Sequence, residues 1–151
     1  MLKKRLGLEA IETDWYSDVN LTNYFKIPST LIIPEGCNRI GKCAFWRCEK
    51  LREVVIPESV KDIGNTAFNN CKKLENVIIS EGVESIRHFA FSECKSLEKV
   101  EIPKSVKEIG SYAFYDCEKT IIILQKPKNE FNEIQIQAFS GCKDVKEETR
   151  N

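Results

Sequence analysis

The chain has 151 residues, of which 42% are hydrophobic, and its 23 basic and 23 acidic side chains give a formal net charge of zero. This length and composition suit a single domain with its own core. The neutral balance argues against nucleic acid or an anionic membrane as the main partner, because both require a positive field. No stretch approaches the roughly 18 apolar residues of a membrane-spanning helix.

The first 29 residues do not match the pattern of the rest of the chain. Residues 1–5 are basic, as in the start of an export signal, but acidic residues follow where an apolar segment would be needed. One face of a short helix would carry Leu2, Leu6, Ile11 and Trp15. Because a stack of repeats exposes its core at each end, we predict that residues 1–29 form an N-terminal cap.

From Thr30 onward the chain repeats. The pentad Ala-Phe-x-x-Cys occurs five times, with a step of 23 residues between copies and 25 before the last. Its phenylalanines are Phe45, Phe68, Phe91, Phe114 and Phe139. A nearly constant period of this length is typical of a solenoid, in which each repeat buries its apolar side only against its neighbours.

Each repeat predicts the same elements in the same order. The pattern Leu-x-x-Val-x-Ile predicts a strand with β-branched residues inward, and a proline at 34, 57 or 103 ends it. A second short strand follows in Val-x-x-Ile. The pentad predicts one turn of 3₁₀ or α-helix with Phe and Cys inward. The glycines at 41, 64 and 110 predict a left-handed turn, although Arg87 holds that position in the third copy.

The last repeat is irregular. Two residues are added between Cys117 and Ala138, and the sequence does not fix where. Val145, three residues after Cys142, is predicted to fill the position of Leu51 in the first copy. We therefore place the solenoid at residues 30–145 and a polar C-terminal tail at residues 146–151.

Five of the seven cysteines end a pentad, and two are extra. Cys37 stands where other copies have Val, and Cys43 stands where they have Thr, Phe or Tyr, so both are predicted to be core substitutions. Free cysteine behaves as a small buried hydrophobe. We expect a ladder of reduced, structural thiols, which favours the cytoplasm or another reducing compartment over secretion.

Residues 51–71 and 97–117 carry the pattern Leu-x-x-Val-x-Ile-Pro-x-Ser-Val-x-x-Ile-Gly-x-x-Ala-Phe-x-x-Cys nearly whole. This pattern resembles the BspA-like (Treponema-type) leucine-rich repeat family, over about residues 30–145. The resemblance implies a right-handed β-solenoid of about five 23-residue coils, with a parallel concave sheet and short 3₁₀ or helical turns on the convex side. It also implies a non-enzymatic protein that binds other proteins, often as a bacterial surface adhesin.

Candidate catalytic and metal sites are few. His88 is the sole histidine, at a position held elsewhere by Lys42, Asn65 and Ser111, and it is predicted to be exposed while Cys94 is buried. Cysteines 37, 43 and 48 are spaced more widely than a structural zinc knuckle. We therefore predict no enzyme activity, no cofactor and no metal site.

The outward positions of the long strands are the candidate partner surface. The middle outward positions are Ile32, Val55, Ile78 and Glu101, and those two residues earlier include Glu53, Asn76 and Lys99. An apolar stripe rimmed by charge is typical of a partner site. The preference of β-branched residues for strands would also explain the apolar stripe, and so would an N-terminal cap that folds over it. Trp46, outward in the first pentad, is either a partner anchor or covered by residues 1–29.

We therefore predict a non-enzymatic scaffold that docks a protein partner on its concave strand face. Two alternatives remain open. One is a fragment of a cell-surface adhesin. The other is a structural unit that assembles with its own copies through the solenoid end or the apolar stripe.

Overall fold

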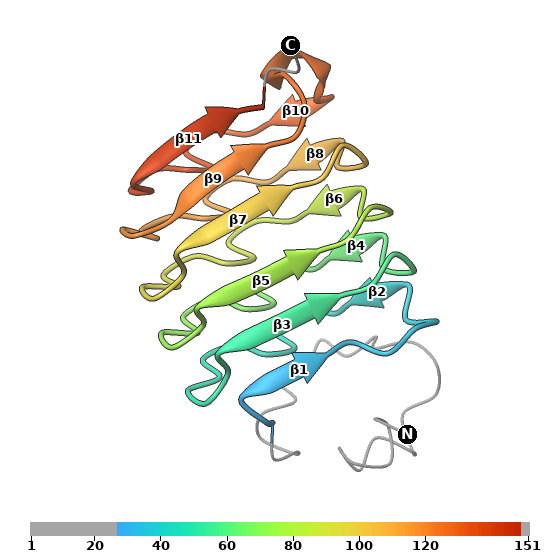
Figure 1. Ribbon diagram of the computed structural model, residues 1–151, viewed down its shortest axis with the longest axis vertical. Helices are drawn as coiled ribbons and strands as arrows, with labels where there is room; N and C mark the ends of the chain where they lie inside the picture. Colours follow the sequence, from blue (N-terminus) through green and yellow to red (C-terminus); the bar gives the residue numbers. More distant parts are fainter. Residues whose placement is uncertain (1–26, 149–151) are drawn as a thin grey trace.

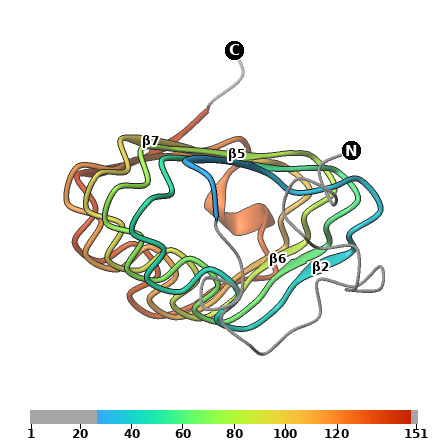
Figure 2. The same cartoon turned by 90° about the horizontal axis from the view of Figure 1, so that it is seen from below.

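A computed structural model describes residues 27–148, so most of the predicted cap and the end of the polar tail lie outside the described residues. The described chain winds into a stack of similar coils (Figure 1). Seen along the stack, β5 and β7 lie on one side of a flattened tube and β2 and β6 on the other (Figure 2). The predicted β-solenoid is confirmed.

Each coil contributes one strand to a long sheet, which we call sheet A. Its strands are all parallel and follow the chain in order. They are β1 (Thr30–Ile32), β3 (Glu53–Ile56), β5 (Asn76–Ile79), β7 (Lys99–Ile102), β9 (Ile121–Leu124) and β11 (Asp144–Glu147).

A second parallel sheet, sheet B, lines the other side of the tube. Its two-residue strands are β2 (Arg39–Ile40), β4 (Asp62–Ile63), β6 (Ser85–Ile86), β8 (Glu108–Ile109) and β10 (Glu133–Ile134). In both sheets the inward residues are apolar, and nearly all of them are buried in one continuous core. The alternation predicted from the sequence therefore sets which face of each strand meets the core.

The pentad phenylalanines stack through the centre of this core. Ring centroids lie 5.1 Å apart between Phe45 and Phe68 and again between Phe68 and Phe91, with nearly parallel planes. The stack continues through Phe114 to Phe139, where the last spacing widens to 6.0 Å. Such a spine combines burial of large apolar side chains with favourable ring packing.

The pentad cysteines contact the same spine. The Cys71 thiol donates a hydrogen bond to the backbone oxygen of Phe45 (3.1 Å), and that oxygen also accepts the N–H of Cys48 (3.2 Å). The arrangement recurs at Cys94, Cys117 and Cys142. A small apolar side chain with a weak donor therefore satisfies the second lone pair of a buried carbonyl. All seven cysteines are free thiols in the structure.

The pentads form tight turns rather than a continuous helical turn. N–H groups bond to the carbonyl three residues back, as in a 3₁₀ helix, from Trp46 to Cys43 and from Cys48 to Phe45. Positive φ at Cys43 (58°) and Arg47 (57°) interrupts the helical path, and the later coils repeat this. Within residues 27–148 the one 3₁₀ helix is η3 (Lys128–Glu130).

The predicted left-handed turn at Gly41, Gly64 and Gly110 is wrong, because none of these residues has a positive φ. Glycine is required at two of them for a different reason. A Cβ built on Gly64 would lie 2.6 Å from the Ile40 oxygen, and one on Gly110 would lie 2.6 Å from the His88 nitrogen. The neighbouring coils approach too closely there for a side chain pointing in that direction.

The structure locates the added residues of the last repeat. Ile121 pairs with Lys99, a spacing of 22, whereas Ile134 pairs with Ile109, a spacing of 25. Against the usual 23, one residue is therefore missing before β9 and three are added between β9 and β10, in the loop that contains η3. After this loop, Phe131 returns to the core at 8% exposure.

The end of the solenoid also differs from the expectation. Val145 pairs with Ile122 in sheet A and therefore occupies a strand position, not that of Leu51. Lys146 and Glu147 belong to β11, so the strand extends two residues into the predicted polar tail. The last coil therefore has no leucine equivalent to Leu51 in the turn before its strand of sheet A.

The buried thiols predict how stability depends on pH. Burial raises the pKa of Cys71, Cys94 and Cys142 above the ordinary value of 9.0, the last to about 12. Above about pH 9 the unfolded chain loses these protons while the folded chain keeps them, so the free energy of unfolding falls as pH rises. Each thiol contributes up to about 1.4 kcal/mol per pH unit.

Urea denaturation between pH 8 and pH 11, a range that extends about two units above the ordinary thiol pKa, measures this slope. The Cys142→Ala variant should start less stable but lose stability less steeply above pH 9, because one thiol whose pKa is raised in the folded chain no longer ionises on unfolding. An equal slope in the variant and the parent chain would contradict this account.

Candidate functional site

The outward face of sheet A brings the predicted apolar stripe together. Ile32 pairs with Val55, and Val55 pairs with Ile78, so the three side chains lie side by side on neighbouring strands. Ile32 and Ile78 are 50% and 51% exposed, and Val55 is half-buried. A rigid parallel sheet thus presents a contiguous apolar strip to solvent, beside Glu53.

The strip is interrupted at β7 by charged side chains. The Lys99 ammonium lies 2.6 Å from a Glu101 carboxylate oxygen, and Gln125 donates to the other oxygen (3.1 Å). The hydrogen bond from Lys99 lowers the pKa of Glu101, and the same contact raises the pKa of Lys99. The two charges compensate each other, so this part of the face is polar but locally neutral.

Beyond β7 the face becomes apolar again at Ile121 and Ile123, which are half-buried. The sequence alone does not reveal that these two residues face outward. Because one residue is missing before β9, a spacing of 23 residues no longer connects equivalent positions of β7 and β9. Four consecutive apolar residues in β9 also hide the alternation of inward and outward positions. The pairing of Glu101 with Ile123 supplies the register that the sequence lacks.

Sheet A opens between β5 and β7. Their register includes the single pair Asn76 and Lys99. Val77 and Ile79 are 7% and 8% exposed, whereas the equivalent inward residues of β3 and β7 are completely buried. An open hollow of about 360 Å³ lies there, with Ile78 and Glu101 at its rim. A partner side chain can therefore reach the edge of the core at this point of the face.

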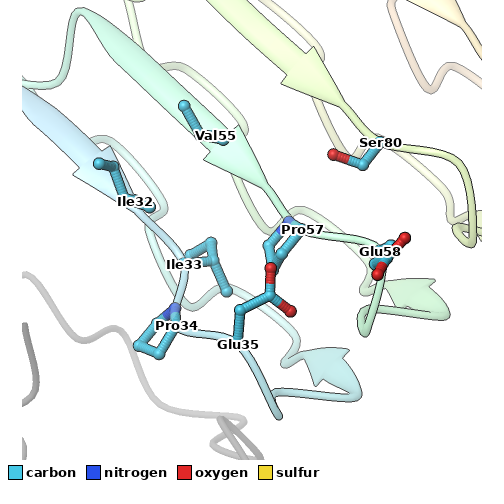
Figure 3. Close-up of a pocket in the computed structure, with 8 residues that line it drawn as sticks. All are labelled: Ile32, Ile33, Pro34, Glu35, Val55, Pro57, Glu58 and Ser80. Carbon is cyan, nitrogen blue, oxygen red and sulfur yellow. The ribbon is translucent and has the colours of Figure 1, made fainter.

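A second hollow, of about 480 Å³, lies where β1 and β3 end (Figure 3). Ile32 and Val55 come from the strands, and Pro34 and Pro57 follow them. Both hollows open on the same face of the solenoid. Sheet A therefore combines an apolar strip with two concave places, a combination that suits a macromolecular partner.

Trp46 does not join this face. Residues 43–48 follow sheet B along the wall that faces away from sheet A (Figure 2). Trp46 is 38% exposed, and its ring N–H donates to the Asn69 side-chain oxygen (3.0 Å). The guanidinium of Arg47 lies 5.1 Å from its ring centroid. The predicted site residues thus fall on two separate surfaces.

The wall that carries Trp46 holds an aromatic cluster that was not predicted from the sequence. Phe89 stacks on Tyr112 (5.0 Å between centroids), and Tyr112 meets Tyr115 edge to face (5.4 Å). Phe89 and Tyr115 are each 39% exposed. The sequence does contain a sign of this cluster, because Phe89 and Tyr112 share the repeat position just before the pentad. Ser92, which holds the position of Trp46 in the third pentad, is buried.

The residues considered for chemistry are kept apart. His88 is exposed and its Nδ1 accepts the Ser111 N–H, whereas the Cys94 thiol points into the core toward Phe68. Cys37 is buried, as predicted, but Cys43 is half-buried and contacts the Thr66 hydroxyl (2.9 Å), so its assignment to the core was wrong.

Within residues 27–148, no three His, Cys, Asp or Glu side chains are grouped as a metal site would require. In the same part of the chain, no helix has the length and apolar character needed to cross a bilayer.

The described coils define a protein class, the parallel β-solenoid with one long and one short strand per turn. Residues 9–146 match the family described as BspA type leucine rich repeat region, in six copies. The chain belongs to this family, and the resemblance seen in its sequence is confirmed. The match begins inside the predicted cap and counts one copy more than the five pentads, while the cap itself stays a prediction.

Solved structures of similar proteins agree. A leucine rich cell surface protein from Faecalibacterium prausnitzii is 29% identical with a TM-score of 0.74, over 83% of this chain and 33% of that protein. A leucine-rich repeat protein from Bacteroides ovatus is 27% identical with a TM-score of 0.53, over 68% of this chain and 37% of that protein.

The leucine rich repeat protein of T. pallidum is also 27% identical, with a TM-score of 0.51, over 79% of this chain and 73% of that protein. The chain thus spans about a third of the length of the first two proteins. A search of curated proteins gave no match.

The ion pair on sheet A gives a prediction. In a Lys99→Met variant the pKa of Glu101 should rise toward its ordinary value, because the hydrogen bond and charge that lower it are lost. The stability that this pair contributes is present above the ordinary carboxyl pKa and is lost as pH falls through the lowered value. Carboxyl-carbon NMR across a pH titration measures the change directly.

Lys146→Met is the matched control, because Lys146 lies on the same sheet face but contacts Asp144. It should leave the Glu101 titration unchanged. A Glu101 pKa that is the same in the Lys99→Met variant and the parent chain would show that the ion pair does not persist in solution.

Proposed function

We propose that this chain is a non-enzymatic scaffold that binds a protein partner on the outward face of sheet A. The observation that carries the proposal is the strip of Ile32, Val55 and Ile78, exposed on three neighbouring strands of a rigid sheet. Exposed apolar patches of this kind on a soluble protein are typical of interaction sites. Membership of a leucine-rich repeat family supports a binding role in general.

The polar neighbours of the strip give the proposed interface its specificity. Glu53, Asn76 and the Lys99–Glu101 pair surround Ile78 and line the hollow between β5 and β7. Interfaces commonly place an apolar centre inside a polar rim. Ile78 is therefore the proposed anchor contact, and the surrounding polar groups set the register and orientation of the partner.

Affinity capture from the native cells, with the purified chain as bait, tests the proposal. The Val55→Asp and Ile78→Asp variants should lose the captured partner, because each places a charge in the apolar centre of the interface. Ile136→Asp is the matched control, since Ile136 is 73% exposed and lies outside sheet A. It should retain the partner.

Circular dichroism melts of each variant separate loss of binding from loss of folding. If folded Ile78→Asp captures the same partner as the parent chain and the Ile136→Asp control, the sheet A face is not the binding surface. A partner lost equally from all three variants would also contradict the proposal, because the effect would not depend on the face.

A second candidate is favoured by one comparison. The similar protein from Faecalibacterium prausnitzii is described as a cell surface protein. We therefore also propose, as the alternative, that this chain acts as part of a surface-displayed repeat array. The seven free thiols favour the first candidate, in a reducing compartment.

Protease treatment of intact cells distinguishes the two locations. Digestion of the chain on intact cells would support surface display, whereas digestion only after lysis would support an internal scaffold. Thiol counting on the denatured protein isolated from those cells gives a second readout. Seven free thiols are expected for the internal scaffold.

A further inference from the structure

The hollow at the ends of β1 and β3 has an unusual lining. Its floor is apolar, with Ile32 and Val55 from the strands and Pro34 and Pro57 beyond them. Figure 3 shows Glu35 extending from the end of β1 toward Pro57, with Glu58 at the matching place on the next coil. We call this feature, lined by these six residues together with Ile33 and Ser80, the β1–β3 groove.

The two glutamates are available for a ligand. Both are exposed, and no ion pair within residues 27–148 includes either carboxylate. The Lys61 ammonium, which lies nearby, bonds to the backbone oxygen of Glu58 (3.4 Å).

The glutamate at the equivalent position of the next coil, Glu81, behaves differently. The Glu81 carboxylate accepts the backbone N–H groups of Lys104 (3.2 Å) and Ser105 (2.9 Å) from the following coil. Glu81 therefore has a structural role that Glu35 and Glu58 do not share. Two carboxylates beside an apolar floor remain without a charged partner in the described chain.

We propose that the β1–β3 groove receives an arginine side chain of the protein partner, an inference that rests on the proposed function. Residues at equivalent positions of neighbouring parallel coils are about 4.8 Å apart. A guanidinium carries five N–H donors in a planar fork, so one group can donate to both carboxylates. The aliphatic part of the arginine lies on Ile32 and Val55.

Other side chains fit the groove less well. An apolar side chain covers the floor but desolvates two carboxylates without pairing them, which is costly. A lysine ammonium is a compact, strongly hydrated charge without the planar fork. An acidic segment is repelled. The groove therefore selects a positively charged, planar head on an apolar stem.

The direct test uses a blocked peptide with one arginine flanked by leucines, and its counterpart with citrulline, which is neutral but has nearly the same shape. NMR titration of the full chain should show amide shifts at residues 32–35 and 55–58 with the arginine peptide. The citrulline and lysine counterparts should bind more weakly. Added salt should weaken the arginine peptide most, because its contact is ionic.

Variants locate the charge contact. Glu35→Gln and Glu58→Gln keep the side-chain shape and should each weaken the arginine peptide by about two- to fivefold, the range for exposed ion pairs. The double variant should approach the citrulline affinity. Glu108→Gln is the matched control, because Glu108 is an exposed glutamate on sheet B. It should bind the arginine peptide as the parent chain does.

Three results would overturn the inference. One is equal binding of the arginine and citrulline peptides, which would leave only an apolar groove. Another is an absence of shifts with either peptide. The third is self-association of the chain that disappears in the double variant, since this would assign the groove to a second copy.

Failure of the arginine contact and failure of the proposed sheet A interface would give different results. If Ile78→Asp abolishes partner capture but the double glutamine variant does not, the sheet A interface stands and the arginine contact fails. If arginine binding maps to the groove but Ile78→Asp leaves capture intact, the groove stands and the interface must be placed elsewhere.

Discussion

Every coil of this protein is held by hydrogen bonds to the next one. The bonds are not confined to the two sheets, because the turns between them also pair with the neighbouring coil, as the Phe68 N–H does with the Ala90 oxygen (2.8 Å). Stacked backbones about 4.8 Å apart leave no freedom for coils of different shape. The inward positions must therefore repeat, and the phenylalanine spine and the thiol contacts to its carbonyls follow from that requirement.

The same constraint explains the glycines and the tolerance of irregularity. Gly64 and Gly110 sit where one backbone presses on another, so their lack of a side chain reflects close stacking rather than backbone conformation. The last repeat, by contrast, accommodates three added residues, because its loop with η3 lies over the end of the tube (Figure 2) before Phe131 returns to the core. The length and conformation of a repeat must therefore be constant where coils are in contact, and they can vary where coils are not in contact.

The outward positions are free of this constraint, and the candidate functions lie there. On sheet A they give an apolar strip, a compensated ion pair and two hollows. On the opposite wall they give Trp46 and the cluster of Phe89, Tyr112 and Tyr115. The repeated cysteines, in contrast, occupy inward positions. A residue that is needed in every coil stabilises the stack, whereas recognition of a partner requires positions at which the coils differ.

Local sequence patterns were enough to predict the repeat, the two strands of each coil, the inward Phe and Cys, and the outward position of Ile32, Val55 and Ile78. A period of 23 and a strict alternation are local properties that survive without knowledge of contacts. The folded structure was needed for every feature that depends on the register between coils. It placed Ile121 and Ile123 on the outward face, separated Trp46 from sheet A, and opened the sheet between β5 and β7. Within residues 27–148 it also left the Glu35 and Glu58 carboxylates without an ion pair, while the Glu81 carboxylate accepts two backbone N–H groups. Such features arise from contacts between residues about one coil apart, and no local pattern records which of those contacts are made.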